Sequence, residues 1–310
     1  RREDVFQVCV VGNTCMHHLF LGISPASLVH APYTPAVSER LVLNAGDYGL
    51  AVQKRAELIM LSDIAGYVGA DTCGCLLAIR QDQQEEISLM IDIGTNGEMV
   101  LGNRERMVTC STAAGPAFEG AKIECGMRGA AGAVDHVKYE DGKWNYTTVG
   151  NKPAVGLCGS GLIDLVAGLL DAGMLDENGV LRSGQEKQGV FILVPPERGG
   201  NERGVYLTQK DLGEVQLAKA AIAAGIQMLM ERLGITEDDI CSVYIAGAFG
   251  NYMDPVSAGK IGLFPATLVK KVKPVGNAAG EGAKIALVNE KEMLEMDELV
   301  RKIEFVELAA

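Results

Sequence analysis

The sequence lacks an uninterrupted apolar stretch long enough to cross a bilayer, and no signal peptide opens it. It also lacks a positive surplus, because the formal net charge is −12 over 310 residues. Such a charge argues against a nucleic-acid-binding surface and suits a soluble enzyme. Hydrophobic residues make up 48% and charged residues 22%, a balance typical of globular chains with one large domain or two moderate ones. We therefore expect neither a nucleic acid nor a membrane as a partner.

A C-x-x-C pair is missing as well, although the chain has eight cysteines. The closest pair is Cys73-Gly74-Cys75, and metal or iron–sulfur sites usually show a tighter ligand cluster. Most of the cysteines lie among Val, Leu, Ala and Gly, where the thiol serves as a small apolar filler. The pattern predicts mainly buried thiols in a reducing cytoplasm, with Cys158 in a glycine loop as the exception to watch.

The stretch 87–102, ISLMIDIGTNGEMVLG, is typical of two strands joined by a turn. The pair Asn96-Gly97 favours a tight hairpin, because both residues adopt positive φ readily. Asp92 ends the first strand, and Gly94, Thr95, Asn96 and Gly97 follow it closely. Backbone N–H groups of such a turn can surround phosphate oxygens while the carboxylate holds Mg²⁺ or its waters. On the turn alone, an ordinary β-hairpin explains the residues equally well.

The part before this hairpin predicts a strand at 5–11 and a short helix at 16–21, with Thr14 as its N-cap. The adjacent His17 and His18 point to different faces, so we expect one packed and one solvated histidine rather than a shared metal site. Prolines and glycines predict an irregular excursion over 24–50. Asp71 precedes a helix at 72–80, where it could activate a water near a γ-phosphate; by itself, a plain N-cap is the favoured interpretation.

Glycine loops follow predicted strands at two further places. Gly159, Ser160 and Gly161 open a helix, and free N–H groups at a helix N-terminus favour anions. A strand near 243 ends in Gly247, Ala248, Phe249, Gly250 and Asn251 before a helix at Pro255. Alternating strands and helices predict an α/β fold with a partly parallel sheet, in which ligands bind outside the carboxyl ends of the strands. One cleft formed by Asp92 and these two loops would be a nucleotide site, with phosphates at the first two elements and adenosine at the third.

Several motifs together resemble a known superfamily. DIGTNGE is similar to the second phosphate-binding hairpin of the actin, sugar-kinase and heat-shock-chaperone ATPases, and VYIAGAFGN is similar to their adenosine motif. GADT stands where the superfamily has its first connecting segment. Within it, VVGNTCMHHLFLG, AAGPAFEGA, GLCGSGLIDL, LTQKDLGEVQLAKAAI and IAGAFGNYMD look like the ATPase domain of the reductive activators of corrinoid proteins. The resemblance covers nearly the whole chain.

The resemblance implies an actin-like (ribonuclease H-like) α/β fold and an ATP-driven, one-electron reduction of cob(II)alamin in a corrinoid partner. That partner is a corrinoid iron–sulfur protein or a methyl-transferring corrinoid protein, and a homodimer is an option. ATP and Mg²⁺ are the implied cofactors. By the motif match, Asp92 orients Mg²⁺ and 94–97 cradle phosphates, while 247–251 line the adenosine pocket and Asp71 positions the attacking water. The role of 159–161 is less firmly implied, because that region of the fold varies.

The resemblance also predicts which parts of the family's fold this chain contains. Residues 1–80 would form a partial first lobe with a connecting helix. Residues 81–310 would form a complete second lobe with an inserted subdomain at about 122–207. We expect the first phosphate hairpin and an iron–sulfur, ferredoxin-like domain to lie before Arg1, since the cysteine spacing here does not match C-x₄-C-x₂-C. We then expect the fragment alone to bind adenine nucleotide weakly or not at all and to hydrolyse ATP negligibly. Two alternatives stay open: a small-molecule kinase of the same superfamily, and a dimerising scaffold that holds nucleotide without turnover.

Overall fold

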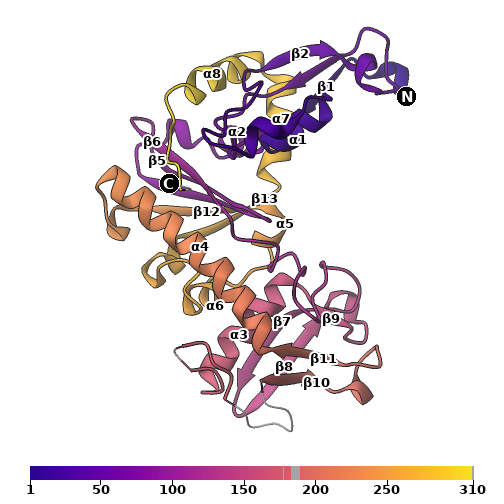
Figure 1. The fold of residues 1–310 in the computed structure, drawn as a ribbon, viewed down its shortest axis with the longest axis vertical. Helices are drawn as coiled ribbons and strands as arrows, with labels where there is room; N and C mark the ends of the chain where they lie inside the picture. Colours follow the sequence, from indigo (N-terminus) through magenta and orange to yellow (C-terminus); the bar gives the residue numbers. More distant parts are fainter. Residues whose placement is uncertain (177, 183–188, 309–310) are drawn as a thin grey trace.

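The computed structural model describes residues 1–176, 178–182 and 189–308. Its centre is a six-stranded sheet in the order β13-β12-β4-β5-β6-β14 (Figure 1). Three of these strands form an antiparallel meander, and the other three add to it in parallel. The bounds are β4 Ser88–Ile93, β5 Gly97–Gly102, β6 Met107–Thr112, β12 Ser242–Ala246, β13 Val272–Gly276 and β14 Glu304–Phe305. The predicted α/β class and the partly parallel sheet are confirmed.

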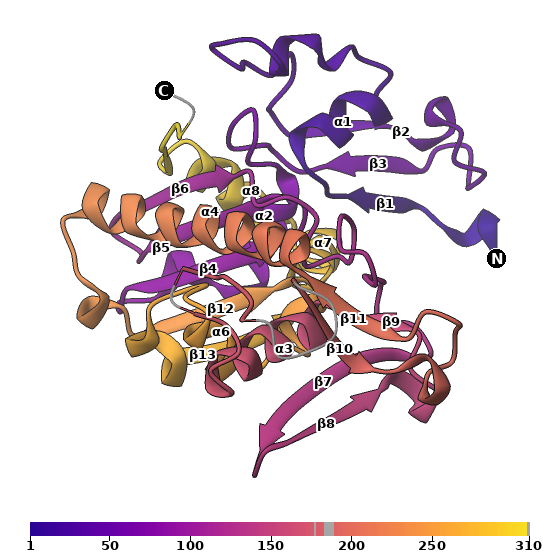
Figure 2. The same cartoon turned by 60° about the horizontal axis from the view of Figure 1, so that its bottom comes forward.

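Helices cover both faces of this sheet because successive side chains of a strand point to opposite faces. Leu89 and Ile91 pack toward the long helix α4 (Gln209–Leu233), which runs across the sheet in Figure 2. Met90 packs on the other face. That face is covered by α2 (Ala70–Ile79), α7 (Ala278–Val288) and α8 (Glu290–Val300). Burial on both faces explains why β4 reads as a nearly continuous apolar run.

The first 60 residues form a smaller sheet, β1-β3-β2, with α1 (Thr14–Phe20) beside it. Its strands are β1 Gln7–Val10, β2 Leu41–Asn44 and β3 Glu57–Met60. The N-cap of α1 is Asn13, whose Oδ1 accepts from the N–H of Met16 at 3.0 Å, so the prediction of Thr14 as the cap was wrong. The excursion at 24–50 also contains more order than expected, since β2 pairs with β3.

A separate group of strands and one helix lies at the opposite end of the molecule (Figure 1). Its elements are β7 Ala133–Glu140, β8 Lys143–Thr148, β9 Gly156–Leu157, α3 Gly159–Asp171, β10 Val190–Val194 and β11 Val205–Thr208. The Asp141-Gly142 turn between β7 and β8 has positive φ at both residues, as expected for a tight hairpin. Within the insertion predicted at about 122–207, residues 177 and 183–188 lie outside the described ranges. The remaining short helices are α5 Gly247–Gly250 and α6 Pro255–Lys260.

Segments far apart in sequence join the first 80 residues to the end of the chain. Helices α2 and α7 cross so closely that a Cβ on Gly282 would lie 1.8 Å from the carbonyl oxygen of Gly74. Asp297 on α8 accepts from Arg40 Nε at 2.7 Å and from Ser62 Oγ at 2.9 Å. The two termini of the chain therefore share one packed unit.

All eight cysteines are free. Cys73, Cys75, Cys110 and Cys158 are buried, three others are half-buried and Cys241 is exposed. The expectation of mainly buried thiols thus holds for half of them. In the ranges described above, no helix has the length and apolar character needed to span a membrane.

Candidate functional site

The predicted hairpin forms at the centre of the large sheet. β4 and β5 pair antiparallel from Ser88–Gly102 to Ile93–Gly97, and the turn is closed by the N–H of Gly94 donating to the carbonyl of Asn96 at 2.9 Å. Neither Asn96 nor Gly97 has positive φ, so the specific turn expected from that pair was wrong. Gly97 is instead the first residue of β5. A Cβ there would lie 2.8 Å from Thr112 Oγ1, so close packing is what requires glycine.

The turn is held from one side by the segment after β6. Thr95 Oγ1 donates to Glu119 Oε1 at 2.7 Å, and the N–H of Gly115 donates to the carbonyl of Thr95 at 2.8 Å. These two hydrogen bonds hold the side chain and the carbonyl group of Thr95. They do not involve the other residues of the turn. The run of small residues after β6 is what lets the backbone come this close.

A second carboxylate, Glu98, stands opposite Asp92 across the hairpin. Its side chain is only 8% exposed and accepts from Ser111 Oγ at 3.1 Å. Burial, then the nearby Asp71 and Asp92, raises the pKa of Glu98 to about 8. Burial and the charge of Asp71 raise the pKa of Asp92 to about 6. Asp92, Glu98 and Asp71 therefore repel one another when charged, and a cation would stabilise their ionised forms.

Asp92 also adjoins the predicted adenosine loop. β12 runs parallel to β4 and places Ala246 beside Asp92, so the loop begins at the same edge of the sheet. Gly247 has φ +87°, and a Cβ there would lie 3.0 Å from Asp92 Oδ1. Glycine is needed here both for the backbone angle and for the close approach of the carboxylate. The side chain of Ala248 lies outside the described part of the loop.

Phe249, in the middle of this loop, lines a cavity of about 520 Å³ at the junction with the inserted strands. Its ring stacks on Phe118 with centroids 5.7 Å apart. Gly159 and Ser160 line the same cavity, and a Cβ on Gly159 would lie 2.6 Å from the ring of Phe249. Gly161 does not line it. That glycine instead lets α3 approach β7, since its Cβ would lie 2.2 Å from the carbonyl oxygen of Val134.

The cavity also reaches the hairpin through Glu119, the acceptor of the Thr95 hydroxyl. Its lining thus joins the end of β6, the start of α3 and the loop after β12. Residues of two predicted loops, Gly159 with Ser160 and Phe249, line this cavity together. The hydrogen bond from Thr95 to Glu119 links the third predicted element, the hairpin, to the cavity.

Asp71 is the second residue of α2 and half-buried, while the N-cap is Gly69, so the capping interpretation was wrong. Its Oδ1 accepts from the N–H of Thr72 at 2.9 Å. Burial raises the pKa of Asp71, with the backbone bond from Thr72 opposing it and Asp63 adding to it. Asp71 lies close enough to Asp92 and Glu98 to raise the pKa of both.

The two adjacent histidines are both buried, so the expectation of one solvated ring was wrong. His17 Nδ1 lies 3.2 Å from a carboxylate oxygen of Asp63. His18 Nδ1 lies 2.8 Å from the carbonyl of Thr14, and its Nε2 accepts from the N–H of Ala36 at 2.9 Å. The rings point to different partners, as their i,i+1 spacing requires.

Two protein-family models match the sequence of this chain. The model described as the C-terminal domain of RACo, the ASKHA domain, matches residues 86–310, and the model of the RACo middle region matches residues 1–84. The chain belongs to the RACo family.

Relatives and a solved structure support the RACo assignment. The corrinoid activation enzyme RamQ of Eubacterium limosum is 36% identical over 99% of this chain and 54% of its own length. The [Co(II) methylated amine-specific corrinoid protein] reductase of Methanosarcina barkeri is 30% identical over 83% of this chain and 49% of its own. A solved reductive activator for corrinoid, iron–sulfur protein superposes with a TM-score of 0.92 at 38% identity, over all of this chain and 51% of that one. The chain thus spans about half the length of the relatives that it matches.

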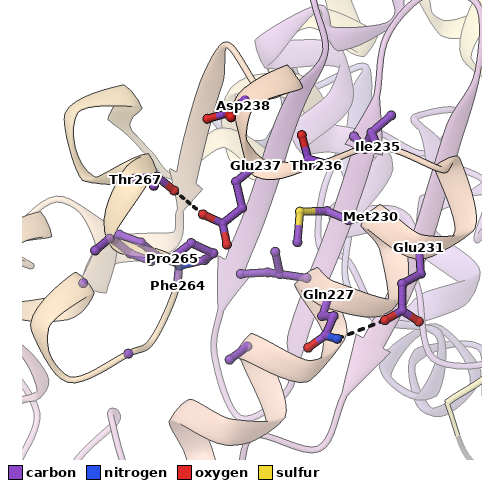
Figure 3. A pocket seen from close by; sticks show the side chains of 15 residues that line it. Gln227, Met230, Glu231, Ile235, Thr236, Glu237, Asp238, Phe264, Pro265 and Thr267 are labelled. Carbon is purple, nitrogen blue, oxygen red and sulfur yellow. Dashed lines mark hydrogen bonds between the residues drawn. The ribbon is translucent and has the colours of Figure 1, made fainter.

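A second hollow, of about 810 Å³ and so larger than the cavity of Phe118 and Phe249, lies away from the hairpin. Figure 3 shows it between the end of α4 and the segments near Glu237 and Thr267, whose side chains are hydrogen-bonded to each other. It contains none of the predicted site residues. Size alone therefore does not identify the RACo site.

Glu98 is the site residue that sequence reasoning missed. The signal was present, because residues at equal distances from a hairpin turn lie opposite each other on one face of the sheet. Counting outward from the turn pairs Asp92 with Glu98, as the register shows.

Proposed function

We propose that this chain is the nucleotide-binding and ATP-hydrolysing part of an activator that drives the reduction of cob(II)alamin in a corrinoid protein. The observation that carries the proposal is the meeting of Asp92 with Gly247 at the ends of two parallel strands, beside the aromatic cavity. The ASKHA assignment and the corrinoid-activating relatives support the same function.

In the proposed site, the adenine base occupies the cavity of Phe118 and Phe249, where flat aromatic walls favour stacking. In the turn Gly94–Gly97, the N–H groups of Thr95 and Asn96 are the proposed donors to the phosphates, since Gly94 donates to Asn96 and Gly97 pairs within the sheet. Gly159 and Ser160 at the start of α3 bring N–H groups and the positive end of a helix to the same cavity. Gly250 and Asn251 complete the loop that carries Phe249.

The residues present fit a magnesium ion held mainly through water. Asp92 and Glu98 are facing carboxylates with raised pKa values, so a cation between them is electrostatically favourable. In the described residues, no group of three or more His, Cys, Asp or Glu side chains could hold a metal by itself. Mg²⁺ characteristically keeps several waters and takes one or two carboxylates plus substrate phosphates. When bound, it would neutralise phosphate charge as bonds rearrange.

Asp71 has the role of orienting the attacking water in this proposal. Its raised pKa makes it a better proton acceptor near neutral pH than an exposed aspartate. The proton would pass from the water to the Asp71 carboxylate as the phosphate bond breaks. The nearby Asp63 raises the pKa of this carboxyl further, and His17 lowers it.

Phosphate release, measured with and without a cob(II)alamin-containing corrinoid protein, tests the proposal. The expected result is hydrolysis that the corrinoid protein stimulates, in a polypeptide as long as the RACo relatives. Transfer of the phosphoryl group to a metabolite would identify a kinase instead. Nucleotide binding without turnover under any condition would identify a scaffold.

A further inference from the structure

The proposed phosphate region is rich in carboxyl groups. Asp92 and Glu98 face each other across the hairpin, and Asp71 lies near both. Among the described residues, no Lys or Arg forms an ion pair with any of these three. A nucleotide brings further negative charge to this region, so a basic side chain that reaches the phosphates would strengthen its binding.

The cavity of Phe118 and Phe249 supplies one candidate for it. Among the described residues that line this cavity, Arg128 is the only Lys or Arg, alongside the carboxylates Glu119 and Asp135. In the described part of the chain, neither carboxylate comes within salt-bridge distance of its guanidinium, and the side chain makes no hydrogen bond. Arg128 is exposed at the rim of the cavity and free to meet a ligand.

The backbone that carries Arg128 is held rigidly. The N–H of Met127 donates to the carbonyl of Leu157 at 2.8 Å, and Gly126 forms a bridge with the same strand. A Cβ on Gly120 would lie 2.5 Å from the nitrogen of Met127, so the chain passes here at close range. The arginine therefore projects from a fixed point, and little backbone entropy is lost when its side chain binds.

The position of the cavity indicates which part of a nucleotide Arg128 would meet. Glu119 connects the cavity to the turn at Thr95, and Phe118 and Phe249 present aromatic rings to a base. Arg128 lines the same cavity as Gly159 and Ser160 at the start of α3, where N–H groups and the positive end of the helix favour phosphate. A guanidinium presents a planar fork of N–H donors that matches phosphate oxygens.

We propose that Arg128 binds the phosphate chain of the adenine nucleotide, so that it distinguishes nucleotides from nucleosides. The inference rests on the proposed nucleotide-binding function and adds the cation that the hairpin itself lacks. Its ligand is the negatively charged polyphosphate rather than the base.

Calorimetric titration of a polypeptide as long as the RACo relatives with adenosine and with Mg-ADP separates the two parts of the ligand. For Arg128→Gln we expect Mg-ADP affinity to fall roughly 10- to 100-fold, the loss typical of hydrogen bonds to a charged group. Adenosine affinity should change by less than about twofold, since only phosphate contacts are lost. Arg128→Lys should fall between the two proteins, because it keeps the charge and loses the fork.

Arg104→Gln is the matched control. Arg104 is also exposed, pairs with Glu85 at 2.9 Å, and does not line the cavity, so its loss should leave both affinities unchanged. Thermal unfolding of both Gln variants checks that the fold is intact.

Three outcomes would overturn the inference. If Arg128→Gln lowers the affinities for adenosine and for Mg-ADP equally, Arg128 stacks on the base. If both affinities stay unchanged, the Arg128 side chain contacts only solvent. In either case the proposed function would stand. Failure of the unaltered chain to bind Mg-ADP would remove nucleotide binding itself, and the inference with it.

Discussion

At the scale of single residues, the chemistry of this chain depends on carboxylates that burial makes reluctant to ionise. Asp92 and Glu98 face each other across a hairpin, and Asp71 lies close enough to raise the pKa of both. Each has a different expected role, so substitutions at the three positions should have different effects.

Asp92→Ala should weaken Mg-nucleotide binding and leave the fold intact. The half-buried carboxylate is disfavoured first by burial and then by repulsion from Asp71, so its removal relieves both costs. Titration calorimetry with Mg-ADP measures the effect. An unchanged affinity would exclude Asp92 from the site.

Asp71→Asn should lower partner-stimulated turnover by roughly 10²- to 10⁴-fold, the usual contribution of an acid–base group, with little change in nucleotide affinity. Asparagine keeps the oxygen that accepts from the N–H of Thr72, so the start of α2 is preserved. Single-turnover phosphate release measures this. If turnover is unchanged while thermal stability falls by about 1 kcal/mol, Asp71 has a structural role only.

Glu98→Gln should change how stability depends on pH. The pKa of Glu98 is about 8 in the folded protein, whereas the unfolded chain releases this proton near the ordinary glutamate pKa of 4.5. Because the folded state binds more protons in this window, the stability of the unaltered protein falls as pH rises from about 5 to 8. Glutamine stays neutral, so the variant should gain on the order of 1–3 kcal/mol relative to the unaltered protein across that window. Urea unfolding at several pH values tests this, and parallel pH profiles would contradict it.

At the scale of elements, close glycine contacts decide how helices meet. Gly74 and Gly282 allow α2 and α7 to cross without side chains between them. This crossing joins the helix that carries Asp71 to the end of the chain, and so contributes to the position of the Asp71 carboxylate.

Gly282→Ala should destabilise the protein by about 1–3 kcal/mol, because the added methyl would lie 1.8 Å from a backbone oxygen that cannot move alone. Gly213→Ala in α4 is the control, since its Cβ would meet nothing within 4 Å. That change should stabilise the helix by about 0.5–1 kcal/mol. Denaturant unfolding of the two variants should give effects of opposite sign. Equal effects would show that crowding at the crossing is not limiting.

At the scale of the whole molecule, the candidate site is assembled from three distant stretches around one sheet edge. The hairpin, the start of α3 and the loop after β12 come from the first, middle and last parts of the chain (Figure 2). A ligand that contacts all three should therefore stabilise the folded state as a unit.

Mg-ADP at about 100 times its dissociation constant should add about 2.7 kcal/mol to the free energy of unfolding. The same ADP concentration with EDTA should add less, because the carboxylates and phosphates then repel one another. Scanning calorimetry with and without the metal measures both. Equal stabilisation in the two conditions would argue against a metal at Asp92.

The sequence by itself determined the elements that depend on local chemistry. The start of α3 at Gly159 and the helix at Pro255 formed as predicted, and α4 opens with a capping box between Thr208 and Asp211. Turn residues and a 3.6-residue period act over a few neighbours, so no partner is needed to recognise them. The motifs also sufficed to recognise the family.

Only the tertiary structure decided features that depend on long-range pairing. β2, β10 and β11 exist because other strands pair with them, and their sequences are too short to show it. His17 and His18 are both buried because Asp63 and Ala36 supply partners from elsewhere in the chain. Arg128 became a candidate ligand only when its loop was placed beside Phe118 and Phe249. Burial and charge proximity arise from contacts between distant residues, and those contacts do not exist until the chain has folded.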